Sequence, residues 1–357
     1  MTTSERLDAL DVFRGLTVAT MILVSTPGSW DGVYPALEHA PWNGWTLADL
    51  VFPFLLFAMG AAVPFALARR RAAAKRVQTH IVRRAMILFG LGLLLNAIAT
   101  APPLHLATFR IPGVLQRIAI VYAAVAWMTE RWPTRAQVVA AIAILAGYWA
   151  ILASRPLSAE HNVGAIVDQW VFGRHMLYPL WDPEGLLSTL PAIASALAGV
   201  FAGDWLKIRG GTWWLFAAGA AAAVVALLWS VVLPINKNLW TSSYALFTAG
   251  LATQTLAVCH WVLDIRRWRW WDRPFAALGR NALAAYFLSV GFDSVLARWT
   301  VSPGVSLKAM IYRNAFAPWL RPCCGAEAAS LAYALTYVAL WSIVLVEMQR
   351  RRIFIGI

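Results

Sequence analysis

A histidine, an asparagine and an aspartate lie close together where a long apolar run begins. His39 and Asn43 precede the run, and Asp49 lies within it, three residues after Thr46. Imidazole is the side chain best suited to take a proton near neutral pH, so His39 is a candidate general base or nucleophile. Thr46 and Asp49 also fit a capping box at a helix start. That structural role leaves His39 and Asn43 unexplained.

Charged side chains also occur inside apolar segments, where an uncompensated charge costs several kcal/mol. Asp11 and Arg14 are three residues apart and can pair on one helix face. Arg117, Arg280 and Asn281 lie within other apolar runs. Guanidinium groups in a bundle cavity suit a phosphate or carboxylate ligand. Arg14 and Arg280 could instead extend to the membrane surface.

Two polar runs flank other apolar segments. Asn236–Asn238 and Asp182–Glu184 lie at their predicted outer ends. Both runs fit helix caps or turns, and the second resembles a helix start with proline in the first turn.

The composition predicts that membrane helices position these residues. Hydrophobic residues make up 60% of the chain and charged residues 13%, against about a half and a quarter in soluble domains. Apolar runs of about 18–24 residues, each able to cross ~30 Å of hydrocarbon, recur along the chain. We expect an all-α bundle of about ten spans, centred in 9–27, 46–68, 85–100, 114–129, 136–153, 185–203, 212–233, 241–263, 274–297 and 328–348.

Basic residues collect on one side of this predicted bundle. Clusters at 69–84, 266–273 and 350–352 fall on the same side as the N-terminus, and fewer Lys and Arg fall on the other. The positive-inside rule therefore predicts that both termini are cytoplasmic. The net charge of +13 then reflects membrane orientation and attraction to anionic lipid, and nucleic acid is not an expected partner.

No segment resembles a soluble domain, and we expect residues 1–357 to form a single transmembrane unit. The first apolar run is long and lacks a small-residue cleavage site, which predicts an uncleaved first span. The sequence has no P-loop, HExxH, CxxC or G-x-S-x-G pattern, so no metal site is expected. Cys323 and Cys324 are adjacent and Cys259 lies in a predicted span, which argues against a disulfide framework.

Five motifs, taken in chain order, resemble the heparan-α-glucosaminide N-acetyltransferase family of polytopic membrane enzymes and its bacterial relatives. They are LDVFRG (10–15), EHAPWNGWTLADLVFPF (38–54), RIPGVLQRIA (110–119), DPEGLLSTLP (182–191) and INKNLWTSSYALFTAG (235–250). The resemblance implies a membrane enzyme that takes acetyl from acetyl-CoA and transfers it to a sugar amino group across the bilayer. It also implies a homodimer.

The second motif aligns the family's catalytic histidine with His39, so the resemblance implies that His39 is the catalytic residue. It implies that Asn43, Asp49, Arg117 and Asn238 belong to the polar pocket around the histidine and the coenzyme.

One position departs from the family pattern. Ser25 stands where the family's first span ends in an asparagine that assists the histidine, and its hydroxyl can still bond an acyl carbonyl. For the coenzyme we expect contacts from Arg14, Arg280 and Asn281, together with Arg117 and Asn238.

The resulting hypothesis is an acetyltransferase of a bacterial inner membrane. Acetyl-CoA enters from the cytosol, and the acceptor is an amino sugar or glycan on the outer side. His39 acts as general base or becomes acetylated itself. The alternatives are an O-acetyltransferase, a transporter or flippase of a polar glycan or lipid head group, and an inactive relative that binds without turnover.

Overall fold

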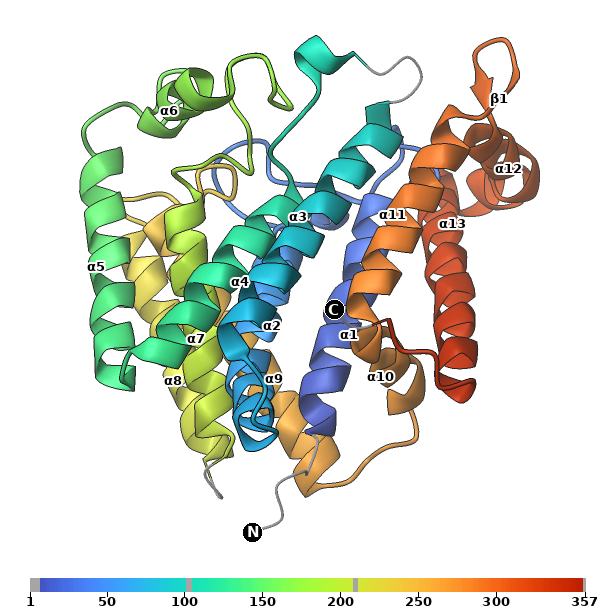
Figure 1. Cartoon of the computed structure of the whole chain (residues 1–357). Coiled ribbons are helices and arrows are strands. Elements are labelled where there is room, and N and C mark those ends of the chain that lie inside the picture. The colour runs from blue at the N-terminus through green and yellow to red at the C-terminus, as the bar shows by residue number, and fades with distance from the viewer. Residues whose placement is uncertain (1–6, 101–104, 208–210, 356–357) are drawn as a thin grey trace.

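The computed structural model describes residues 7–100, 105–207 and 211–355, and this part of the chain is almost entirely helical (Figure 1). The two short strands, β1 (Thr300–Ser302) and β2 (Val305–Ser306), form an antiparallel hairpin. The α-helices are α1 (Asp8–Ser25), α2 (Leu47–Ala72), α3 (Val77–Thr100), α4 (Val114–Arg131), α5 (Thr134–Leu152), α6 (Val163–Phe172), α7 (Thr189–Trp205), α8 (Thr212–Trp229), α9 (Ser242–His260), α10 (Asp272–Arg280), α11 (Ala282–Arg298), α12 (Leu307–Ala315) and α13 (Ala317–Arg350). Shorter helical turns are η1 (Pro35–Leu37), η2 (Leu106–Thr108) and η3 (Trp261–Ile265).

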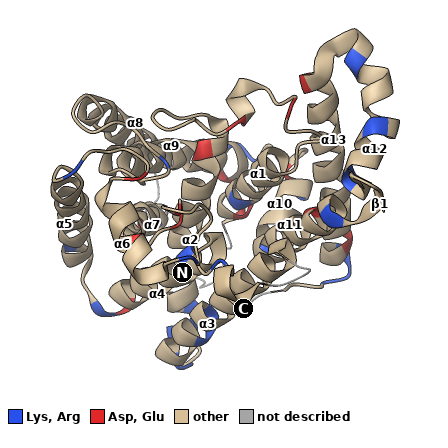
Figure 2. Cartoon of the chain, turned by 90° about the horizontal axis from the view of Figure 1, so that it is seen from above, with Lys and Arg blue, Asp and Glu red and all other residues tan. Residues whose placement is uncertain are grey.

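Nine of the ten predicted spans each coincide with one helix and the tenth is divided between α10 and α11, which confirms an all-α membrane bundle. Six of the described helices are long and apolar enough to cross a membrane, and the bent pair α10–α11 makes a seventh. Of the other three, α1 and α4 carry more charged residues and α7 has 17 residues. Most of the ribbon is uncharged (Figure 2), as expected for a chain whose outer helices face lipid.

The continuous span predicted over 274–297 was wrong, because the chain turns there through 86° between α10 and α11. Asn281 forms the corner with non-helical backbone angles (φ −114°, ψ 32°). Its buried side-chain amide bonds the backbone of the C-terminal segment at Ile353 and Ile355. A partner more than 70 residues away therefore holds the break, and local hydropathy cannot reveal it.

The helices approach most closely where small residues meet. Gly199 and Gly203 of α7 lie four residues apart and face α2. A Cβ at Gly199 would lie 2.1 Å from the carbonyl oxygen of Phe57, and one at Gly60 of α2 would lie 1.9 Å from that of Ala196. This contact is the small-residue packing typical of membrane helices, where backbones come together without an intervening side chain.

We therefore expect Gly199→Ala to destabilise the bundle by about 1–3 kcal/mol, because the added methyl group forces α2 and α7 apart. Thermal unfolding in detergent measures the effect. Gly147→Ala in α5 is the matched control, since a Cβ there meets nothing within 4 Å. Equal midpoints for the two variants would contradict the close packing of α2 and α7.

Candidate active site

His39 is held by a carboxylate at the start of α2. Its Nδ1 lies 2.8 Å from Oδ1 of Asp49, whose side chain is 1% exposed, whereas the His39 side chain is 54% exposed. The other carboxylate oxygen, Oδ2, accepts hydrogen bonds from the backbone N–H groups of Ala40 and Thr46, both at 3.0 Å. Asp49 therefore caps the helix with one oxygen, as the sequence predicted, and orients the imidazole with the other.

This contact defines the chemistry available to His39. When Nδ1–H donates to Asp49, the ring's second nitrogen, Nε2, carries the free lone pair. A base or nucleophile oriented by a carboxylate, on a half-exposed ring, can take a proton from an incoming amine or attack an acyl group.

Lys237 completes the cluster, although only its neighbour Asn238 was expected at the site and Lys237 itself was predicted to lie in a cap or turn. Its Nζ lies 3.0 Å from each ring nitrogen of His39 and 3.6 Å from Oδ1 of Asp49. Burial lowers the pKa of Lys237, and the Asp49 carboxylate partly opposes that shift. The signal in the sequence was a lysine between two asparagines in a segment that also matched the family pattern.

A pair of asparagines joins the two loops that carry these residues. Nδ2 of Asn236 donates to Oδ1 of Asn43 over 3.1 Å, and the backbone N–H of Gly44 donates to the carbonyl of Ile235 over 2.8 Å. Asn43 thus positions the loop of Lys237 against the loop of His39. Asn236 has the structural role here, whereas no side-chain hydrogen bond of Asn238 is found within the described residues.

Ser25 and Arg117 lie apart from these contacts. Ser25 is exposed at the last position of α1. Arg117 is buried in α4, where it donates to the carbonyl of Gly185 and the hydroxyl of Ser188 and lies 5.0 Å from the ring centre of Trp240. Arg117 therefore fastens the start of α7 to the core.

A second arginine fastens the same loop. Arg110 binds Asp182 with two hydrogen bonds of 2.8 and 2.9 Å and also pairs with Glu184. The pKa of Arg110 is raised because these two carboxylates outweigh the cost of its burial. The run Asp182–Glu184 thus serves as an anchor at the rim of the bundle.

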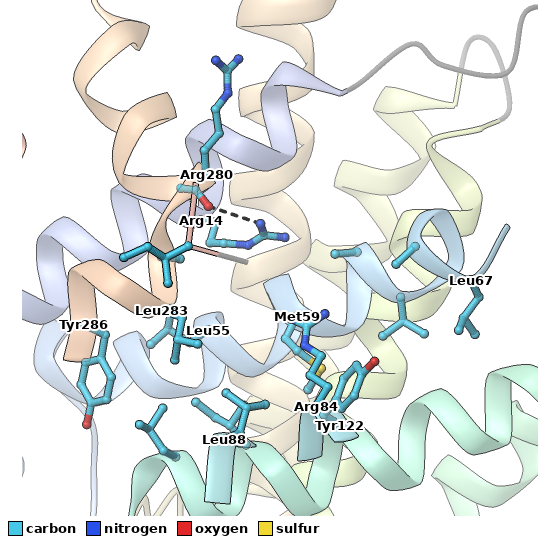
Figure 3. Close-up of a pocket in the computed structure, with 18 of the residues that line it drawn as sticks. Arg14, Leu55, Met59, Leu67, Arg84, Leu88, Tyr122, Arg280, Leu283 and Tyr286 are labelled. Carbon is cyan, nitrogen blue, oxygen red and sulfur yellow. Dashed lines mark hydrogen bonds between the residues drawn. The ribbon is translucent and has the colours of Figure 1, made fainter. Parts of the chain in front are cut away.

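Two of the other predicted binding residues, Arg14 and Arg280, line a cavity of about 320 Å³. Its polar lining consists mainly of arginines, and its walls carry apolar side chains such as Leu55, Met59 and Leu88. Figure 3 shows Arg14 of α1 and Arg84 of α3 beside the apolar lining residues, whereas the guanidinium of Arg280, at the end of α10, points away from them. The four arginines are Arg14, Arg69, Arg84 and Arg280.

Two of these arginines are fixed by neighbouring groups. Arg14 donates to the carbonyl of Gly279 over 3.3 Å, as Figure 3 marks, and Arg280 pairs with Asp11 at 3.2 Å. Asn281 does not line the cavity itself. It accepts a hydrogen bond from the backbone of Ile355, a residue that does line it.

Helix α2 connects the histidine cluster with the cavity. Asp49 lies in its first turn, and Met59, ten residues further on, lines the cavity, a rise of roughly 15 Å along the axis. Val51 lies between the two, in an apolar cluster against which the cavity-lining residues Leu55 and Tyr286 pack. No group of three His, Cys, Asp or Glu side chains suited to a metal ion is found among the described residues.

Comparison with known proteins gives one family and two curated relatives. A family described as a domain of unknown function, DUF5009, matches residues 6–106. The human heparan-alpha-glucosaminide N-acetyltransferase is 25% identical over 98% of this chain and 59% of its own length. The mouse heparan-alpha-glucosaminide N-acetyltransferase is 28% identical over 79% of this chain and 53% of its own length.

The chain thus spans somewhat more than half the length of these two relatives. The match with the human protein extends over nearly all of the chain, and it agrees with the five motifs found in the sequence. The chain is therefore similar in sequence to the heparan-alpha-glucosaminide N-acetyltransferases, the family that its motifs indicated.

Proposed function

We propose that this protein is a membrane N-acetyltransferase that takes acetyl from acetyl-CoA on the cytosolic side and transfers it to an amino sugar or glycan on the outer side. The observation that carries the proposal is the His39–Asp49 pair, with Nδ1 held at 2.8 Å and the rest of the ring half exposed. The relatives, named for transfer to a glucosaminide, indicate an amino sugar as the acceptor class.

The arginine-lined cavity suits the coenzyme. Coenzyme A combines several phosphate charges with a long, weakly polar arm that ends in the thioester. Arg14, Arg69, Arg84 and Arg280 would hold the phosphates, since guanidinium groups bind phosphate oxygens in pairs. The basic cluster at 69–84 lies on the side that the positive-inside rule assigns to the cytosol.

His39 would carry out the transfer at the other end of α2. In the direct route its Nε2 takes the proton of the acceptor amine as the amine nitrogen attacks the thioester carbon. The carbon–sulfur bond then breaks, its electron pair stays on sulfur, and the proton passes to the coenzyme A thiolate. In the covalent route Nε2 itself attacks the thioester carbon, and the carbon–sulfur bond breaks with its electron pair on the coenzyme A thiolate. The amine nitrogen then attacks the acetyl carbon, the bond from that carbon to Nε2 breaks with its electron pair returning to Nε2, and the amine proton passes to the thiolate. Asp49 stabilises the imidazolium in the direct route and orients the ring in both.

The catalytic role predicts that His39→Ala abolishes acceptor-dependent release of free thiol from acetyl-CoA. The measurement uses purified protein in nanodiscs with glucosamine as the acceptor. His161→Ala is the matched control, because His161 is an exposed histidine of an outer loop away from Asp49. Equal rates for the unsubstituted protein and His39→Ala would remove His39 from the mechanism. Binding of coenzyme A without any thiol release would favour an inactive relative.

The cavity assignment predicts that Arg84→Met raises KM for acetyl-CoA about tenfold and leaves kcat nearly unchanged. Loss of one charged hydrogen bond costs about 1.5–3 kcal/mol, and each 1.4 kcal/mol is a factor of ten. The adjacent Arg83 is exposed outside the cavity, so Arg83→Met should keep the original KM. An equal KM for both variants would place the coenzyme elsewhere.

A further inference from the structure

The ammonium group of Lys237 lies against one face of the His39 ring. Its Nζ is 3.0 Å from both Nδ1 and Nε2. A nitrogen at equal distances from the two ring nitrogens must lie above the ring near Cε1, because a position in the ring plane would overlap that carbon. The lone pair of Nε2 points outward in the ring plane, so Lys237 leaves it open to an acceptor.

A rigid turn fixes the lysine in this place. The backbone N–H of Trp240 donates to the carbonyl of Lys237 over 3.0 Å, and Trp240, which is 1% exposed, has a left-handed φ of 50°. Such a conformation is costly for a large residue and persists only where the surroundings enforce it. The Asn236–Asn43 hydrogen bond ties the same turn to the loop of His39.

The position beside Nε2 is where an acyl oxygen must lie. In the covalent route of the proposed transfer the thioester carbon bonds to Nε2. In the direct route it bonds to the acceptor nitrogen whose proton Nε2 takes. Its carbonyl oxygen then falls within a few ångströms of the ring edge. Lys237 Nζ has three N–H donors, and Asp49, at 3.6 Å, is the carboxylate nearest to it. Donors remain for a substrate oxygen on the open side.

We propose that Lys237 is a further catalytic residue whose ammonium group donates a hydrogen bond to the acyl oxygen and stabilises the oxyanion of the tetrahedral intermediate. This assignment rests on the proposed acetyl transfer. As the acceptor nitrogen bonds to the acyl carbon, the carbonyl π electrons move to oxygen beside Nζ–H. As the carbon–sulfur bond breaks, that electron pair returns to reform the carbonyl. Lys237 keeps its proton throughout.

The electrostatic surroundings of Lys237 give this role a distinctive pH dependence. Burial lowers its pKa most strongly, Asp49 and Glu184 act to raise it, and Arg117 acts to lower it further. The net direction is downward, so the ammonium form is lost at a lower pH than for an ordinary lysine. A reaction that needs this ammonium must therefore slow as the pH rises through the lowered pKa.

The test compares Lys237→Met with Lys237→Arg in the thiol-release assay. We expect Lys237→Met to lower kcat by about 100-fold or more, as typically follows from loss of one oxyanion donor, with KM for acetyl-CoA within twofold. Lys237→Arg should retain more activity, and its alkaline fall in rate should disappear because guanidinium stays charged. Ethylammonium added to Lys237→Ala should restore part of the rate.

Lys308→Met is the matched control. Lys308 is also buried (8% exposed) and pairs with a carboxylate, Asp293, at 2.8 Å, but it lies between α11 and α12 and away from His39. We expect this variant to lose stability and keep its kcat per folded molecule.

An unchanged kcat in Lys237→Met, or the same alkaline fall in Lys237→Arg and the unsubstituted protein, would overturn the assignment and leave the acetyltransferase proposal in place. If Lys237→Met fails to fold, the arginine variant and the ethylammonium rescue decide the matter. No acceptor-dependent release by the unsubstituted protein would overturn the proposed function and the role of Lys237 together.

Discussion

The end of the bundle at which α2 begins depends on one buried carboxylate. Asp49 caps α2, holds His39 and faces Lys237, and its side chain is 1% exposed. A buried carboxylate without partners would be very costly. The Asp49 carboxylate is stabilised by its backbone donors and by the side chains of His39 and Lys237. The helix start and the reactive histidine are consequently fixed by the same group, and the position of one determines the position of the other.

Helix α2 extends this constraint to the cavity. It begins with the Asp49 cluster, packs backbone to backbone against α7 at Gly60, and lines the cavity at Met59. Glycine contacts of this kind leave little room for sliding, since the nearest atoms are backbone atoms rather than flexible side chains. The separation between Asp49 and the cavity is therefore set by the packed core, and the Asp49 contact extends it to His39 in the preceding loop.

The parts that sequence predicted are those determined by nearby residues. A membrane helix satisfies its backbone hydrogen bonds internally, so apolar runs revealed every long helix. Spacing alone suggested that Asp49 could cap α2, and the family resemblance placed it in the same pocket as His39. Lys237 reaches His39 from 198 positions along the chain, and Asn281 breaks its helix through bonds to residues 72 and 74 positions away. Such contacts depend on how helices assemble, which no local pattern encodes.

The proposed arrangement also places the phosphate charges of the coenzyme away from the site of acetyl transfer. Phosphate groups carried into the hydrocarbon would lose their hydration, whereas a thioester and its flexible arm lose little. Arginines gathered at one end of the bundle would let the charged part of the coenzyme stay at the membrane surface. The arm alone then has to cross the apolar layer around Leu55 and Tyr286 to reach His39. In that arrangement an acetyl group crosses the membrane without a binding site for a charged group near the bilayer centre.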